Sequence, residues 1–185
     1  MLFRSTVSKA VPLRMMVYNL PLICKFNITP PVLDAICEVS PVDVVKDAPM
    51  DMEHITTMLA AAGDRFPILY GQRLTLIPSL VLGSGGFVGT GPELYGARAR
   101  DFFKVHAMSP DERFDLHYRY NLLNRALIEG LGTPPAGLKA ALNILGLPAG
   151  DPRDHISPLT PSEERELRDI MVRAGVIEGR LAKRA

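Results

Sequence analysis

Short apolar runs of strand length recur along the first 90 residues of the chain. Each run is rich in β-branched, aromatic or other apolar side chains, and polar or glycine-containing segments separate one run from the next. Such runs are typical of buried strands. We therefore expect strands at residues 12–18, 42–45, 66–70 and 86–89.

Segments of helical period lie between these runs. In residues 51–62, for example, Met52, Ile55, Met58 and Leu59 recur at the spacing of one helix face. Thr29 is followed by two prolines, and a threonine cap with proline in the first turn is typical of a helix N-terminus. We expect helices at residues 3–10, 29–37, 51–62 and 74–82.

The alternation of strands and helices predicts an α/β protein, because strand–helix–strand units pair in parallel through right-handed crossovers. Four parallel strands alone would leave two open sheet edges, whereas a closed (β/α)8 barrel takes about 250 residues. The predicted fold is therefore a partial TIM (β/α)8 barrel, about its last four β/α units, followed by a C-terminal helical appendix. We infer that roughly the first half of the barrel is missing.

After Pro92 the pattern becomes helical only. Cap residues followed by proline, at Ser109 and Thr133, begin two of the expected helices, and Thr160 with Glu163 forms a capping box. The expected helices cover residues 93–106, 110–130, 134–145 and 160–175. We accordingly divide the chain into 1–91, the second half of a barrel, and 92–185, the last barrel helix with a three-helix segment.

Composition narrows the class of protein. Hydrophobic residues make up 47% and charged residues 22% of the chain, as in ordinary globular proteins. The formal charge of +1 shows no basic excess of the kind that nucleic-acid binding requires, and no apolar window is long enough to span a membrane. Cys24 and Cys37 are too few for a disulfide framework and fit a reducing cytoplasm. The histidine spacing predicts no metal site.

Lys46 is the candidate for the chemistry. It follows the apolar run 42–45 and therefore lies at the C-terminal end of a buried parallel strand, where α/β proteins build their active sites. Apolar surroundings disfavour the charged form of an amine, and a neutral amine can attack a carbonyl carbon to form an imine. The alternative is a strand-end lysine whose ammonium simply reaches water.

Tyr18 and Gly71 occupy the corresponding ends of the first and third runs. A tyrosine hydroxyl beside an imine-forming lysine can shuttle protons, although a half-buried strand tyrosine is the simpler interpretation. Glycines such as Gly71, and those that bracket the fourth run, let backbone amides approach a carboxylate because they have no Cβ. Turn formation would explain these glycines equally well.

Taken in order, these segments resemble the dihydrodipicolinate synthase / N-acetylneuraminate lyase family. Residues 16–21 (MVYNLP) are similar to the family's tyrosine motif on the fifth barrel strand, and residues 44–47 (VVKD) to its lysine motif on the sixth. Residues 69–71 and 83–89 are similar to the family's seventh and eighth strands. Residues 138–146 and 158–159, with Arg153, are similar to its C-terminal helical segment.

The resemblance implies a lyase or aldolase in which Lys46 forms a Schiff base with pyruvate or a related 2-oxo acid. Tyr18 would relay protons, and backbone around Gly71 and Val88 would line the pocket. No metal or organic cofactor is implied, and the expected partner is a small 2-oxo acid, with no nucleic acid or membrane. Family members are commonly dimers or tetramers, so we expect a homo-oligomer or association with a missing N-terminal half.

The chain also departs from the family. It has no glycine–threonine–threonine–glycine–glutamate segment, which in the family helps to hold the substrate carboxylate. Ile23 stands five positions after Tyr18, where true synthases have an arginine, and an apolar side chain cannot bind a carboxylate bidentately. A 2-keto-3-deoxy sugar acid aldolase, or another pyruvate lyase, is at least as compatible with the sequence as lysine biosynthesis.

Two other interpretations stay open. The chain can be a non-catalytic half-barrel remnant, or one half of a two-chain barrel. An open α/β sheet that binds phosphates would need a glycine-rich turn that opens a helix after a strand, and residues 83–88 instead lead into a strand.

Overall fold

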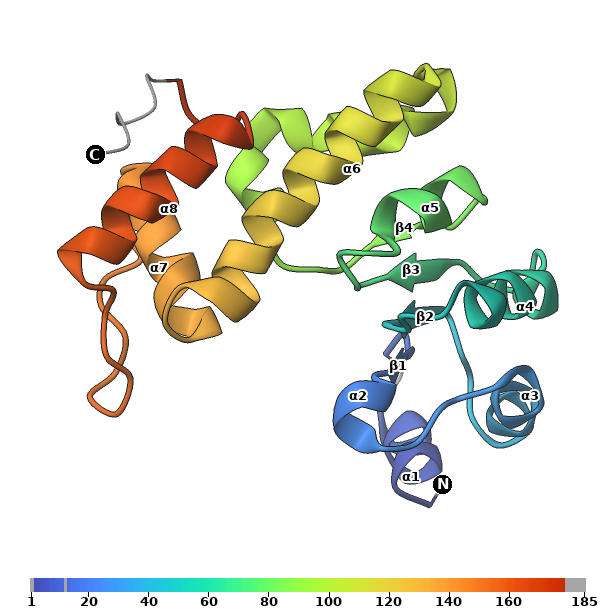
Figure 1. Cartoon of the computed structure of the whole chain (residues 1–185). Helices are drawn as coiled ribbons and strands as arrows, with labels where there is room; N and C mark the ends of the chain where they lie inside the picture. The colour runs from blue at the N-terminus through green and yellow to red at the C-terminus, as the bar shows by residue number, and fades with distance from the viewer. Residues whose placement is uncertain (1, 12, 179–185) are drawn as a thin grey trace. The chain divides into compact units, whose positions relative to one another are not determined.

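The computed structural model describes residues 2–11 and 13–178. By its internal contacts the chain divides into two compact units, Met1–Gly89 and Thr90–Ala185 (Figure 1).

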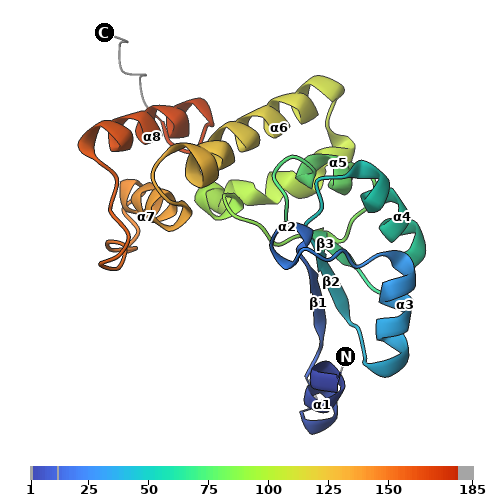
Figure 2. The ribbon, with the colours of Figure 1, turned by 60° about the horizontal axis from the view of Figure 1, so that its bottom comes forward.

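The first unit is built on a parallel sheet. Within the described residues the strand order is β1-β2-β3-β4, and each neighbouring pair is parallel. Figure 2 shows β1, β2 and β3 side by side. This arrangement confirms the prediction of a parallel α/β sheet. The strands are β1 (Met16–Asn19), β2 (Val44–Asp47), β3 (Ile68–Tyr70) and β4 (Gly86–Phe87).

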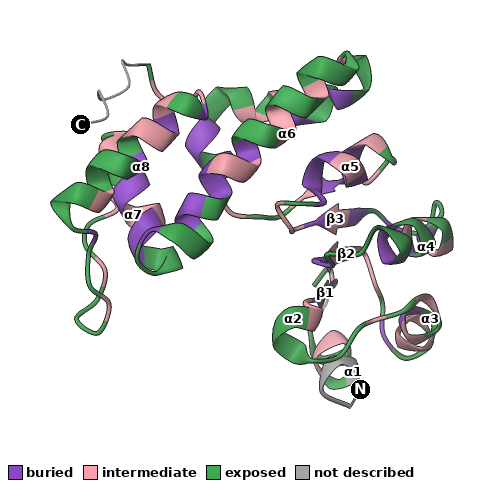
Figure 3. Ribbon diagram, viewed as in Figure 1, coloured by how far each residue is buried: buried purple, intermediate pink, exposed green. Residues whose placement is uncertain are grey.

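Helices connect these strands, as expected for β/α units. Two of them, α3 and α4, pack against one face of the sheet through side chains that are almost completely buried. Figure 3 shows the buried positions on the strands and on these helices. The helices of the unit are α1 (Leu2–Ala10), α2 (Pro21–Cys24), α3 (Pro30–Val39), α4 (Met52–Ala62) and α5 (Leu76–Val81). The core they form includes Val17, Leu33, Val45, Ile55, Met58 and Ile68.

The strands do not begin and end where the apolar runs predicted. We expected a strand over residues 12–18, but β1 begins at Met16, and Pro12 lies outside the described residues. The backbone amide of Met15 donates to the side chain of Asp43 (2.6 Å), and the pairing of β1 with β2 begins at Met16 and Val44. Lys46 lies inside β2, which ends at Asp47, instead of following it.

Two helix predictions also need correction. The short helix α2 was not predicted. It begins at Pro21 and ends at Cys24, and its C-cap Lys25 is the only described non-glycine residue with positive φ (53°). Thr29 is the N-cap residue of α3, as expected from its position, but its side chain makes no capping hydrogen bond.

The second unit consists of helices. The segment expected as one helix over residues 93–106 is a 3-10 helix, η1 (Pro92–Ala107), interrupted at Gly96 (φ 55°, ψ −130°), a backbone conformation open essentially to glycine alone. A π-helical turn, η2 (Ala126–Gly130), continues α6. The α-helices of this unit are α6 (Pro110–Arg125), α7 (Pro134–Ile144) and α8 (Pro161–Arg173).

Aromatic rings form the centre of this unit. Phe102 is fully buried and makes edge-to-face contacts with Tyr95 (centroids 5.5 Å apart) and Tyr120 (5.4 Å apart), the geometry that ring quadrupoles favour. Leucine and methionine side chains from α6, η2 and α8 complete the core at Leu123, Leu127, Leu167 and Met171.

The predicted capping box of α8 is confirmed. The Thr160 hydroxyl accepts a hydrogen bond from the Glu163 backbone amide (3.3 Å), and the Glu163 carboxylate accepts one from the Thr160 backbone amide (2.7 Å). These hydrogen bonds from Thr160 lower the pKa of Glu163 below its usual range.

We expect Thr160→Ala to lower the free energy of unfolding by about 1 kcal/mol at neutral pH, because the first turn of α8 loses its cap. Thr160→Ser keeps the hydroxyl and serves as the control. The folded state lowers the pKa of Glu163, so this part of the stability is present at neutral pH and is lost as pH falls through the lowered pKa. Urea unfolding at neutral and acidic pH measures both effects; equal stabilities of the alanine and serine variants at neutral pH would contradict the assignment.

Candidate active site

Lys46 and Tyr18 lie side by side at the carboxyl ends of two paired strands. In the register of β1 and β2, Tyr18 is directly opposite Lys46. The Lys46 Nζ atom lies 3.9 Å from the centroid of the Tyr18 ring. The tyrosine motif and the lysine motif, 28 positions apart in the sequence, thus meet because the two strands are parallel and in register.

Both side chains lie on the face of the sheet that α3 and α4 do not cover. Because strand side chains alternate between faces, Val17 and Val45 enter the core while Tyr18 and Lys46 point the other way. Tyr18 is 48% exposed, and Lys46 is partly exposed. Among the described residues, none forms an ion pair with Lys46.

Gly71 adjoins both Val88 and Lys46. A Cβ atom added at Gly71 would lie 2.8 Å from the backbone oxygen of Val88 and 3.4 Å from the Cε atom of Lys46. Only a residue without a side chain fits this close approach of two strand ends. The structure therefore brings together all four predicted site residues, although their roles stay predictions.

An apolar pocket of about 350 Å³ lies beside Tyr18. Part of its wall comes from α2 and the residues that follow, a segment that sequence reasoning did not recognise as a helix. Ile23, on the same helix, is 69% exposed. The remaining lining residues are Asn19, Leu20, Cys24, Phe26, Ile28, Val32 and Ile36.

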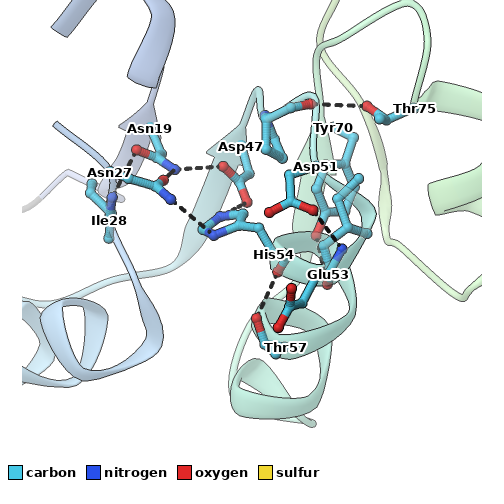
Figure 4. Close-up of polar contacts among 12 residues, drawn as sticks. Asn19, Asn27, Ile28, Asp47, Asp51, Glu53, His54, Thr57, Tyr70 and Thr75 are labelled. Carbon is cyan, nitrogen blue, oxygen red and sulfur yellow. Dashed lines mark hydrogen bonds and ion pairs between the residues drawn. The ribbon is translucent and has the colours of Figure 1, made fainter. Parts of the chain in front are cut away.

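Four polar side chains form a network behind the site, on the helix-covered face of the sheet (Figure 4). They belong to Asn19, Asn27, Asp47 and His54. Asp47 is fully buried; its carboxylate accepts a hydrogen bond from the Asn19 amide (2.8 Å) and lies 3.1 Å from the His54 Nε2 atom. The Asn27 side chain joins Asn19 to His54. Sequence reasoning missed this network. The available signal was a polar residue directly after each of Tyr18 and Lys46, in strands that are otherwise apolar.

Tyr70 closes the core next to this network. Its hydroxyl donates to the backbone oxygen of Ile55 (3.3 Å). Burial raises the pKa of Tyr70 well above its usual range, and the nearby Asp47 carboxylate raises that pKa further. Tyr70 therefore stays protonated as a structural donor, whereas Tyr18 is about half exposed.

No three histidine, cysteine, aspartate or glutamate side chains gather as metal ligands would in the part of the chain that the structure describes. Over the same residues, none of the helices is both long enough and apolar enough to cross a membrane.

The fold and the site together define a parallel α/β protein built from four strands and their connecting helices, with a lysine and a tyrosine side by side at the strand ends. The chain belongs to the dihydrodipicolinate synthetase family, whose sequence profile matches residues 2–174.

Individual relatives agree with this assignment. A 4-hydroxy-tetrahydrodipicolinate synthase from Prochlorococcus marinus (strain MIT 9301) is 27% identical over 170 residues, which cover 91% of this chain and 56% of the relative. The chain thus spans little more than half the length of the curated relatives it matches.

Solved structures show the same fold. The crystal structure of DHDPS from Cyanidioschyzon merolae with lysine bound is 30% identical, has a TM-score of 0.78, and is matched over 92% of this chain and 58% of its own. CdNal from Clostridium difficile, solved in complex with mannosamine, has a TM-score of 0.80 at 21% identity, over 91% of this chain and 58% of its own. At that identity the second likeness concerns the fold alone.

The close approach at Gly71 gives a direct test of the site geometry. We expect Gly71→Ala to destabilise the protein by about 1–3 kcal/mol, because the new methyl group would collide with the Val88 backbone oxygen and press on Lys46. Gly130→Ala is the matched control, since its Cβ would meet only one atom at an ordinary 3.6 Å. Urea unfolding of both variants measures the difference, and equal losses of stability would show that the approach is looser than described.

Proposed function

We propose that this chain carries the imine-forming part of a pyruvate-dependent lyase or aldolase. Lys46 is the nucleophile, and the substrate is pyruvate or a related 2-oxo acid. The observation that supports this most directly is the position of the Lys46 amine, 3.9 Å from the centroid of the Tyr18 ring at the carboxyl ends of paired parallel strands.

The chemistry needs a base, an acid and an electron sink. The unprotonated Lys46 nitrogen attacks C2 of the 2-oxo acid, and the carbonyl oxygen takes up a proton to give a carbinolamine. A second proton, taken up by the carbinolamine hydroxyl, lets it leave as water and gives a protonated imine. Removal of a proton from C3 gives an enamine, which forms a carbon–carbon bond to an aldehyde acceptor whose oxygen takes up a proton. Water then hydrolyses the product imine and releases the Lys46 amine. Tyr18, whose ring adjoins the amine, is the side chain proposed to move these protons.

Gly71 and Val88 are proposed to line the space around the Lys46 amine, where pyruvate would bind. The absence of a side chain at Gly71 leaves space beside the Cε atom of Lys46, where the imine carbon and its carboxylate must lie. This part of the site needs no metal or organic cofactor in the proposed reaction, because the covalent imine itself stabilises the carbanion.

The acceptor end has a different character. Ile23 stands where an arginine would bind a second carboxylate, and its exposed side chain (69%) supplies no charge. We therefore propose an acceptor aldehyde other than aspartate semialdehyde, as in a 2-keto-3-deoxy sugar acid aldolase or another pyruvate lyase.

The open sheet face supports a second proposal about assembly. Met16 (46% exposed) and Tyr18 (48%) lie on a face that the described helices of the same unit do not cover. In a complete site this face would be closed by further β/α units, from another polypeptide or a second copy; without them the chain would be a non-catalytic remnant.

Its two free cysteines, Cys24 and Cys37, suit the cytoplasm that we propose as its location.

Borohydride reduction of the full chain with pyruvate tests the proposed nucleophile. We expect one reduced pyruvyl group on the peptide that contains Lys46, as read by peptide mass spectrometry. Lys46→Arg should give no adduct, because a guanidinium does not form the imine. Lys104→Arg is the control, since Lys104 is exposed and paired with Asp101. Folded protein that gives no adduct, or adducts spread evenly over its lysines, would contradict the proposal.

A second experiment tests the proton relay. Tyr18→Phe keeps the ring beside Lys46 but removes the hydroxyl, so we expect the trapping rate at saturating pyruvate to fall by about 10²–10⁴-fold. The pyruvate concentration that gives half the maximal rate should change little. An unchanged maximal rate would mean that Tyr18 has only a packing role.

A further inference from the structure

The network behind the site has a hydrogen-bond pattern that fixes the state of each side chain (Figure 4). The Ile28 backbone amide donates to the Asn19 Oδ1 atom (3.0 Å), so the Asn19 Nδ2 group must face the other way. That group donates to Asp47 Oδ1 and Asn27 Oδ1, at 2.8 Å each. The Asn27 oxygen is therefore on the Asn19 side, and its Nδ2 group faces His54.

This orientation determines the tautomer of His54. The Asn27 Nδ2 group lies 3.2 Å from the His54 Nδ1 atom, which must accept that hydrogen bond. The His54 Nε2 atom, 3.1 Å from Asp47 Oδ2, must then carry the ring hydrogen and donate it. Tautomers follow from hydrogen-bond networks in this way. In this arrangement every polar group of the Asp47 carboxylate and the His54 ring has a hydrogen-bond partner.

The network connects directly to the strand ends that carry the candidate site. Asn19 follows Tyr18 in β1, Asp47 follows Lys46 in β2, and Asn19 and Asp47 are in register. His54 comes from α4 and holds the second oxygen of the Asp47 carboxylate. The side chains of Lys46 and Asp47 point to opposite faces of the sheet, so His54 does not reach a substrate bound to Lys46.

We propose that His54 is a positioning residue, which acts through Asp47 to hold the Lys46 amine over the Tyr18 ring. This inference rests on the proposed function for its catalytic meaning, but its geometric claim is independent of activity. Without the His54 donor, one oxygen of a fully buried carboxylate loses its partner. A buried acceptor in that state must move to find water, and the end of β2 would move with it.

Nuclear magnetic resonance tests the geometric claim directly. The Lys46 side chain lies over the face of the Tyr18 ring, so the ring current should shift the Hε protons of Lys46 upfield in the wild type. His54→Leu should remove more than half of this shift, measured against Tyr18→Leu as the value without a ring. His54→Gln should keep most of it, because a glutamine amide can donate to Asp47 and accept from Asn27. If folded His54→Leu keeps the wild-type shift, the proposal is wrong.

Trapping kinetics test the catalytic meaning. At saturating pyruvate, we expect the trapping rate of His54→Leu to fall about 10-fold to 100-fold, as small misplacements of reacting groups do. The half-saturating pyruvate concentration should change less than about twofold, and His54→Gln should restore most of the rate. A purely structural role would lower stability while the folded fraction kept the wild-type rate, and that result would overturn the proposal.

If His54→Leu does not fold, His54→Asn takes its place, because asparagine is too short to reach Asp47 from α4. The ring-current shift of Lys46 and the trapping rate are then measured on His54→Asn. ¹⁵N spectra of the histidine ring provide a separate check, with the Nε2–H tautomer expected and the Nδ1–H tautomer contradicting the network. A wild type that forms no imine would refute the proposed function, while the ring-current comparison would still judge the positioning.

Discussion

The in-register parallel pairing of β1 with β2 is the constraint on which both sides of the candidate site depend. It places Tyr18 opposite Lys46 and, one residue later, Asn19 opposite Asp47. Strand side chains alternate, so the first pair faces the open side of the sheet and the second pair faces the helices. A slip of β2 by one residue would turn the Lys46 ammonium into the apolar core and carry Asp47 away from His54. The same register therefore places Tyr18 beside Lys46 on the open face and buries Asn19 and Asp47 on the face that the helices cover.

The buried side explains why that register is specified so strongly. Asn19, Asp47 and His54 are each less than 10% exposed, and burying such groups is costly unless their hydrogen bonds are made. Here the bonds run continuously from the Ile28 backbone amide to the His54 ring. A network of this kind tolerates few alternative arrangements, because moving any member leaves another without a partner. The back of the site is thereby fixed while its front stays accessible.

The front of the site has two chemically different ends. Gly71 lies close to both Lys46 and Val88, whereas α2 presents the exposed apolar side chain of Ile23. Membership of the dihydrodipicolinate synthetase family and the departure at Ile23 are compatible on this view. The first end would retain the imine chemistry, and the second would select an acceptor without an additional carboxylate.

The sequence by itself determined the alternation of strands and helices, the capped start of α8 and the candidates Lys46 and Tyr18, because hydrophobic period and capping chemistry act over a few residues. It placed element ends less well: Lys46 lies within β2, and α2 was missed. Only the tertiary structure decided that Asn19, Asn27, Asp47 and His54 meet. They come from different segments, and the identity of a polar residue does not show whether strand pairing and helix packing will bury it or leave it in water.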